Sequence, residues 1–290
     1  MRSTNGFQEH PMATRQQIIA ARDMVKVFRS RTTPGKFVHI QRVEVAADLL
    51  LRVASPIRIN QAEGSLCGPA SVVFLTAERD PETYARFVIE LYENGESRLG
   101  KLVVKPGADC LRYNPKSGSS SYYVPPADWI ALASFRDSQN RVFDYQSHKN
   151  RFAGITTPAQ LTTWLQCLGY KATLNDANVA FHKPLANAKR ANDLFLKGYK
   201  ICLLINANVL DAMAASMSTA PRLRFAPGGV RPKVLPDHWV PLLSPLSIAS
   251  SGIQFEIFTW GKRRMVPGTG SALSQDDFVR HFFGFVACMM

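Results

Sequence analysis

The residues from Cys67 to Ala77 carry no charge, and this run constrains the fold of the chain more than any other feature. Pro69 favours the first turn of a helix, where its missing N–H costs nothing, and Gly68 lets the backbone approach a neighbouring group closely. A helix that is apolar on all sides must be surrounded by other elements. The pattern therefore predicts a buried helix with the Cys67 thiol at its N-terminal end.

The position of Cys67 favours chemical reactivity. The N-terminus of a helix presents unpaired N–H groups and the positive end of the peptide dipole, and both stabilise a thiolate. Gln61 lies shortly upstream, where its side-chain amide can donate to an oxyanion that forms beside the backbone N–H of Cys67. Together the two residues predict a nucleophile with an oxyanion donor.

This segment resembles the nucleophile segment of papain-like cysteine peptidases. In both, Asn-Gln (here Asn60 and Gln61) precedes a short turn with Gly and Ser, and Cys-Gly follows at the head of a helix. The run 67–70, Cys-Gly-Pro-Ala, is closer to the bacterial branches, such as bacteriocin-processing peptidases and papain-like toxin or effector domains. The resemblance implies an α+β fold of papain-like type. In it, a helical subdomain packs the nucleophile helix on an antiparallel β-sheet that carries a histidine.

The resemblance assigns the role of base to His238. The apolar run 236–243 predicts a strand with His238 at its start, and the run 252–261, which ends in Trp-Gly, predicts its hairpin partner. An imidazole there carries the positive charge that compensates a thiolate, and it later protonates the leaving amine. The other histidines lie in polar segments or in and beside predicted helices: His10, His39, His148, His182 and His281.

The third catalytic position departs from the family pattern. Family members carry Asn or Asp just before the Trp-Gly turn, whereas this chain has Phe258 and Thr259. Phenylalanine cannot accept the second N–H of the histidine, so Thr259 is the better candidate. Glu256 and Asp237 are held in reserve.

Composition limits the partners and cofactors. The net charge is +13 and the pI is about 9.8, but the basic residues are spread along the chain without a nucleic-acid motif, so a nucleic-acid partner is not expected. The five cysteines are widely spaced without a Cys-x-x-Cys pair, which disfavours disulfides and zinc. No cofactor or metal is expected, and a reducing compartment fits best.

The chain divides into a polar N-terminal arm at 1–35, flexible or partner-binding, and a hydrolase domain at 36–290. Within the arm, residues 16–28 have the spacing of a short amphipathic helix. No export signal or membrane-spanning run is present, which predicts a cytoplasmic protein in the producing cell. Analogy with the bacterial branches adds secretion into a target cell by a signal-peptide-independent machine.

Further elements follow from caps and periodicity. Helices are predicted over 37–53, from Asp80-Pro81 to residue 94, over 126–135, from Thr157-Pro158 to Gly169, over 185–196, over 211–217 and from Ser274; strands are predicted over 99–104, 170–174 and 200–206. The apolar C-terminal tail is expected only to pack.

These features predict a cysteine protease or amide hydrolase that acts on a protein or peptide, with a cognate inhibitor or immunity protein as a further partner. The same site would also serve acyl transfer, transglutamination or cleavage of peptidoglycan amides. Two alternatives have no catalysis: an inactive papain-like module that binds a partner, and a basic nucleic-acid-binding protein.

Overall fold

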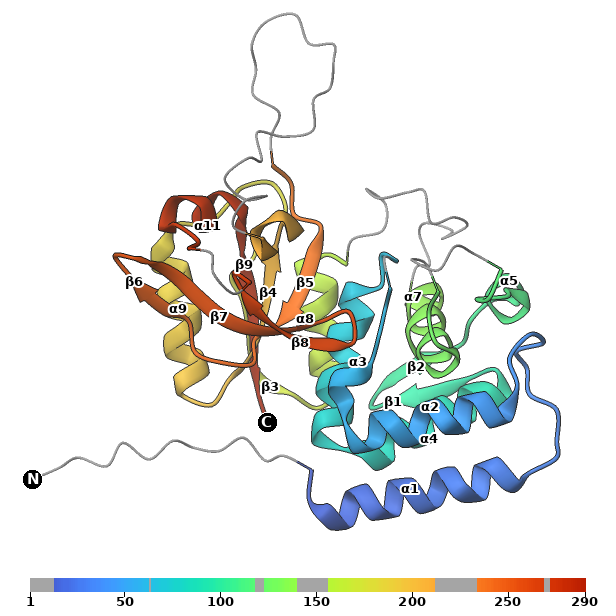
Figure 1. Cartoon of the computed structure of the whole chain (residues 1–290). Coiled ribbons are helices and arrows are strands. Elements are labelled where there is room, and N and C mark those ends of the chain that lie inside the picture. The colour runs from blue at the N-terminus through green and yellow to red at the C-terminus, as the bar shows by residue number, and fades with distance from the viewer. Residues whose placement is uncertain (1–12, 63, 118–122, 140–155, 212–233, 269–271) are drawn as a thin grey trace, which may run out of the picture.

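The computed structural model describes residues 13–62, 64–117, 123–139, 156–211, 234–268 and 272–290. Most of the described helices gather in one half of the molecule and the two larger antiparallel sheets lie in the other, which confirms the predicted α+β class (Figure 1). The helical half contains α1 (Arg15–Ser30), α2 (Arg42–Ala54), η1 (Pro56–Arg58), α3 (Cys67–Arg79), α4 (Pro81–Asn94), a hairpin of β1 (Ser97–Leu99) and β2 (Leu102–Val104), α5 (Ala108–Arg112), α6 (Pro126–Asp128), a π-helical turn at Trp129–Ala133, α7 (Ser134–Gln139) and α8 (Pro158–Cys167).

The sheet half follows α8 along the chain. It contains β3 (Lys171–Asn175), α9 (Leu185–Leu196), β4 (Lys200–Ile205), η4 (Ala207–Leu210), β5 (His238–Pro241), β6 (Ser247–Ala249), β7 (Gly252–Thr259), β8 (Lys262–Val266), α11 (Gln275–His281) and β9 (Phe282–Met289). Two sheets form, with the strand orders β3-β9-β4-β5 and β6-β7-β8, and every pairing is antiparallel.

Helix α3 begins at Cys67, as predicted, and every residue from Cys67 to Ala77 is buried. It lies at the boundary between the halves, where it packs against β5 (Figure 1). The ring of Phe74 stacks on that of Phe258 from β7, with the ring centroids 4.1 Å apart. The helix ends before Asp80, whose carboxylate accepts the backbone N–H of Thr83 and caps α4 as predicted.

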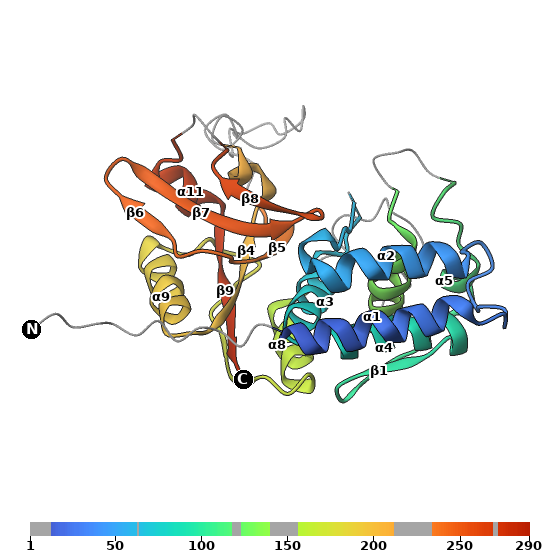
Figure 2. The same cartoon turned by 60° about the horizontal axis from the view of Figure 1, so that its bottom comes forward.

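Helix α1 corrects the prediction of an N-terminal arm. The amphipathic helix is present, but Ala21, Val25 and Phe28 are buried in the core, and α1 lies along α2 and α4 (Figure 2). From Arg15 to Ser30 the predicted arm is therefore part of the packed domain, because its apolar face covers these helices. Residues 1–12 lie outside the described residues.

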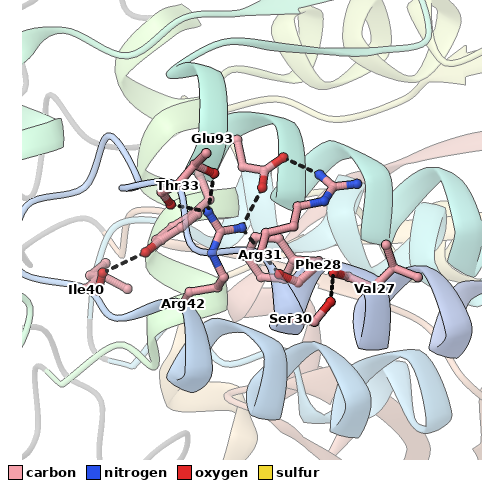
Figure 3. A network of polar contacts seen from close by, with 9 residues as sticks. Val27, Phe28, Ser30, Arg31, Thr33, Ile40, Arg42 and Glu93 are labelled. Carbon is pink, nitrogen blue, oxygen red and sulfur yellow. Dashed lines mark hydrogen bonds and ion pairs between the residues drawn. The ribbon is translucent and has the colours of Figure 1, made fainter.

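A charged network fixes the end of α1. Arg42 donates to Glu93 at 2.5 Å and to the backbone oxygen of Thr33 at 2.5 Å, and Arg31 donates to the other Glu93 oxygen at 2.6 Å (Figure 3). The Arg42 guanidinium also lies over the Phe28 ring, 4.5 Å from its centroid. Residues from α1, α2 and α4 are thus joined in one network.

Strand pairing corrects two predictions. The C-terminal tail is strand β9, which lies between β3 and β4 at the centre of its sheet. The ladder partner of β5 is β4, and β7 pairs with β6 and β8, so β5 and β7 are not a hairpin. They meet beyond the end of β5, where Leu242 bridges Ile257 and the N–H of Leu243 donates to the oxygen of Glu256 at 2.8 Å.

The remaining cap and strand predictions are confirmed for α2, α4, α8, α9, β4 and α11, with ends shifted by a few residues. The short helix α5 was not predicted, and residues 99–104, predicted as one strand, span the turn and the second strand of the β1–β2 hairpin. The helix expected over 211–217 lies outside the described residues after Asp211.

Strand β4 separates two apolar cores. Its side chains alternate, so that Cys202 and Leu204 join the core of the helical half, whereas Ile201, Leu203 and Ile205 join a second core with β7, α9 and α11. Both faces of the strand are buried, which accounts for its unbroken apolar sequence.

Candidate functional site

Cys67 stands at the first position of α3 and is only 4% exposed. Burial raises the pKa of its thiol above the ordinary value. Backbone hydrogen bonds from Trp239 and Gly68 and the positive charge of Arg136 oppose this rise in pKa, whereas the charge of Asp237 adds to it. Because burial dominates, the thiol is protonated at neutral pH in this arrangement.

His238 is the first residue of β5, where it pairs with Ile205 of β4, and it is 4% exposed. Its Nε2 atom is 2.7 Å from Oγ1 of Thr259, and its ring stacks on Trp260 with the centroids 4.8 Å apart and the planes 11° apart. Burial, with a smaller contribution from the charge of Arg264, lowers the pKa of His238 to about 4. The imidazole is therefore neutral at pH 7.

The contact with Thr259 has a consequence for the tautomer of His238. If the threonine hydroxyl accepts a hydrogen bond from an Nε2–H group, the Nδ1 atom of the neutral ring carries no hydrogen and can act as a base. Nδ1 is then the nitrogen that is available to a thiol. The same contact and the stacked Trp260 ring hold the plane of the imidazole.

Strand β5 contacts the Cys67 thiol through the backbone of the residue that follows His238. The backbone N–H that binds the sulfur of Cys67 belongs to Trp239, the residue directly after His238. The indole Nε1 of Trp239 donates to the backbone oxygen of Thr156 at 2.7 Å. A Cβ atom added to Gly68 would lie 2.0 Å from Oγ1 of the same threonine, so α3 approaches Thr156 as closely as a glycine allows.

Gln61 is buried in the turn that leads into α3, and its backbone oxygen accepts the N–H of Gly64 at 3.3 Å. The turn after β7 packs against Asn60, the residue before Gln61, since a Cβ atom added to Gly261 would lie 3.0 Å from Cβ of Asn60. Ala62 adopts a left-handed φ of 49°, which L-residues rarely adopt. Gln61 therefore lies in a constrained turn beside the end of the strand that carries Thr259.

A buried ion pair between Arg52 and Asp128 fixes the start of this turn. Asp128 accepts two hydrogen bonds from Arg52, at 2.7 and 2.5 Å, and a third from the backbone N–H of Asn60 at 2.9 Å. Asp48 accepts another Arg52 nitrogen at 3.0 Å. Burial raises the pKa of Asp128 to about 6, while Arg52 and the N–H of Asn60 act against this rise. The three donors keep the carboxylate ionised at neutral pH, and Asn60 is thereby fixed.

The two reserve candidates for the third position have other partners. Glu256 forms an ion pair with Arg263. Asp237 accepts the backbone N–H of Ala207 at 2.7 Å. Thr259 is the residue whose side chain meets the histidine, as the sequence order suggested.

Sequence reasoning missed Arg136, Thr156 and Asp128. All three are buried polar residues, and Arg136 donates to Oγ1 of Thr156 at 3.1 Å. A signal was available for two of them, because Asp128 and Arg136 flank the uncharged and mostly apolar run 129–135. A charge in a run that must be buried indicates a specific partner.

Among the residues that the structure describes, no group of three or more His, Cys, Asp or Glu side chains is placed to hold a metal ion. Within the same described ranges, no helix has the length and apolar character needed to cross a membrane. The Cys67 thiol and the His238 imidazole are the groups of this site that have the chemistry of a nucleophile and of a base.

No family model, curated protein or solved structure matches this chain. Its function is therefore inferred from the arrangement of its own residues.

Proposed function

We propose that this chain is a cysteine hydrolase of papain-like type that cleaves amide bonds in a protein or peptide. One observation carries the proposal. His238 forms a hydrogen bond with Thr259 and stacks on Trp260, and the backbone N–H of the next residue in β5, Trp239, binds the sulfur of Cys67. These residues occur in the order of a thiol protease site. The resemblance of 60–68 to the nucleophile segment of that family supports the same interpretation.

In the proposed reaction, Nδ1 of His238 takes the proton of the Cys67 thiol, and the sulfur attacks the carbonyl carbon of the substrate. The oxyanion forms beside the backbone N–H of Cys67, which has no acceptor within the helix because it lies in the first turn, and Gln61 is the second donor. The imidazolium then protonates the leaving amine as the C–N bond breaks. His238 then takes a proton from the water molecule that attacks the thioester carbon, the C–S bond breaks to release the carboxylic acid, and the imidazolium returns the proton to the sulfur.

Thr259 would act by orienting the imidazole. Its hydroxyl would accept a hydrogen bond from an Nε2–H group, but unlike the Asn or Asp of the family it cannot supply a negative charge or an amide oxygen. We therefore expect Thr259 to fix the tautomer of His238 without stabilising the imidazolium strongly.

A second function is favoured by the protonation states. Cys67 and His238 are both buried, and burial keeps both neutral. A catalytically inactive papain-like module that binds a partner would have the same features.

Acyl transfer and cleavage of peptidoglycan amides would pass through the same thioester and differ only in the acceptor or substrate. Delivery into a target cell as an effector or toxin stays a prediction.

The test uses the full chain with a peptide library, with peptidoglycan, and with a peptidyl vinyl sulfone that modifies reactive thiols. We expect covalent modification at Cys67 and cleavage that the Cys67→Ala substitution abolishes. Cys167→Ala is the matched control, since Cys167 is a free and partly exposed thiol at the end of α8, and this substitution should leave activity unchanged.

His238→Ala should slow the modification of Cys67 while leaving labelling of Cys167 unchanged. Cleavage by the Cys67→Ala variant at the rate of the natural chain would rule out the nucleophile. Modification of Cys67 that does not depend on His238, without any cleavage, would favour the binding module.

A further inference from the structure

We propose that Arg136 and Thr156 are positioning residues of this site, with the Arg136 guanidinium supplying the positive charge that faces the Cys67 thiolate when it forms. This inference rests on the proposed function and adds two residues to it. It starts from a buried cation in the helical half, since Arg136 is 2% exposed.

Thr156 joins three parts of the site. Its hydroxyl accepts from Arg136 of α7 at 3.1 Å, and its backbone oxygen accepts from the Trp239 indole of β5 at 2.7 Å. Its side chain also touches the first turn of α3, since a Cβ atom on Gly68 would lie 2.0 Å from Oγ1 and 2.5 Å from Cβ of Thr156. The residues after the cysteine and after the histidine therefore meet at this one threonine.

The charge of Arg136 acts on the sulfur in the direction that the reaction needs. It is the charged side chain that lowers the pKa of Cys67, against the dominant effect of burial. The low-dielectric surroundings strengthen the interaction of a guanidinium with a thiolate. His238, whose pKa burial lowers to about 4, is poorly suited to remain as a stable imidazolium at neutral pH. The buried cation Arg136 would share that role.

The charged and titratable groups that act on this pair lie on several elements. Arg136 of α7 favours the thiolate, and Asp237, just before β5, disfavours it. His238 of β5 is the proposed acceptor of the proton, and Arg264 of β8 disfavours the imidazolium. A change at Arg136 alone therefore moves the balance in one direction, toward the protonated thiol.

The experiment measures thiolate formation at Cys67 as a function of pH. The ultraviolet absorbance of the thiolate is titrated in the full chain and in its Cys67→Ala variant, and the difference isolates Cys67 without requiring access to it. The rate of iodoacetamide modification of Cys67 is followed in parallel by mass spectrometry, with Cys167 as the internal reference. The variants are Arg136→Met, Arg136→Lys and Thr156→Val.

We expect Arg136→Met to raise the pKa of Cys67 and to slow its modification about tenfold at a fixed pH, as for loss of a nearby opposite charge. Arg136→Lys should recover most of the rate because it keeps the charge. Thr156→Val keeps the shape of the side chain and removes the hydroxyl acceptor, so it should shift the profile in the same direction by less. Cys167 should be unaffected in all three variants.

A folded Arg136→Met variant with an unchanged profile would overturn the proposal, as would an Arg136→Lys variant as slow as Arg136→Met. If Arg136→Met fails to fold, Thr156→Val decides, and an unchanged profile there overturns the proposal. His238→Ala separates the two levels. If it leaves the Cys67 profile unchanged while Arg136→Met shifts it, the proposed dyad fails and the role of Arg136 stands; the reverse result removes Arg136 alone.

Discussion

The protonation state of His238 gives the folded chain a pH dependence of stability that can be measured. Burial lowers the pKa of His238 from 6.5 to about 4. Between these values the unfolded chain binds a proton that the folded chain does not, so the free energy of unfolding falls as the pH falls. The contribution is present above about pH 6.5 and is lost progressively toward pH 4. At pH 5 the loss is about 2 kcal/mol, and it approaches about 3 kcal/mol below pH 4.

The assay is urea unfolding of the natural chain and of His238→Gln at pH 7 and pH 5. Glutamine does not titrate, and its amide can still reach the hydroxyl of Thr259. Carboxylates and His281, whose pKa burial also lowers, contribute to both proteins and cancel in the difference. We expect the natural chain to lose about 2 kcal/mol more than His238→Gln over this range, a difference large enough for denaturant unfolding to resolve.

The opposite sign would refute this reasoning. If the folded site holds a thiolate and an imidazolium, the pKa of His238 is raised in the folded state. Its contribution to stability is then fully present below the unfolded pKa and is lost as the pH rises through the folded pKa. The natural chain would gain stability relative to His238→Gln between pH 7 and pH 5. That result would show that the paired charge outweighs burial at this site.

Two further predictions concern the contacts that hold the walls of the site. Gly68→Ala should destabilise the fold by about 1–3 kcal/mol, because the added methyl overlaps Thr156. In the double variant, Thr156→Ala should recover part of this loss. If urea unfolding shows that the two costs simply add, the contact between the residues is contradicted. Asp128→Asn should lower the free energy of unfolding by about 3–5 kcal/mol, because it leaves the Arg52 charge buried with a weaker partner. Asp48→Asn should lower it by less, because Asp48 is partly exposed. Equal shifts in the thermal unfolding temperature of the two variants would contradict the ion-pair geometry.

Local signals sufficed to predict where several helices of the helical half begin. The start of α3 at Cys67 follows from an uncharged run with proline in its first turn, and the caps at Asp80 and Thr157 begin α4 and α8. Each of these signals acts within a few residues of the chain. Such elements are therefore predictable from the sequence without knowledge of their neighbours.

The strand pairings were not predictable in the same way. Strand β9 is the last element of the chain, yet it lies between β3 and β4. The apolar sequence of β9 is equally consistent with a packed tail, because burial on both faces removes the alternation that marks a strand. Helix α1 had a visible amphipathic pattern, but the α2 and α4 surfaces that cover it are set by the tertiary fold.

Some residues of the site could be predicted from the sequence and others could not. Cys67, His238 and Thr259 could be named from their order and their positions in predicted elements, and the structure joins His238 to Thr259 and the backbone of Trp239 to Cys67. The contribution of Thr156 could not be predicted, because this residue lies far along the chain from both Cys67 and His238 and has no distinguishing sequence context. Its meaning comes only from the three contacts it makes.

The identity of the third residue affects how the charge of the site is balanced. A carboxylate or an amide oxygen at the position of Thr259 would favour the imidazolium, whereas a hydroxyl orients the ring with little effect on its charge. In this chain the positive charge of Arg264 disfavours the imidazolium further, and burial acts in the same direction. If the site is catalytic, its thiolate must therefore draw more of its stabilisation from groups other than His238. Arg136 donates to Thr156, which contacts the first turn of α3, and it is the side chain whose charge acts on the sulfur in that sense.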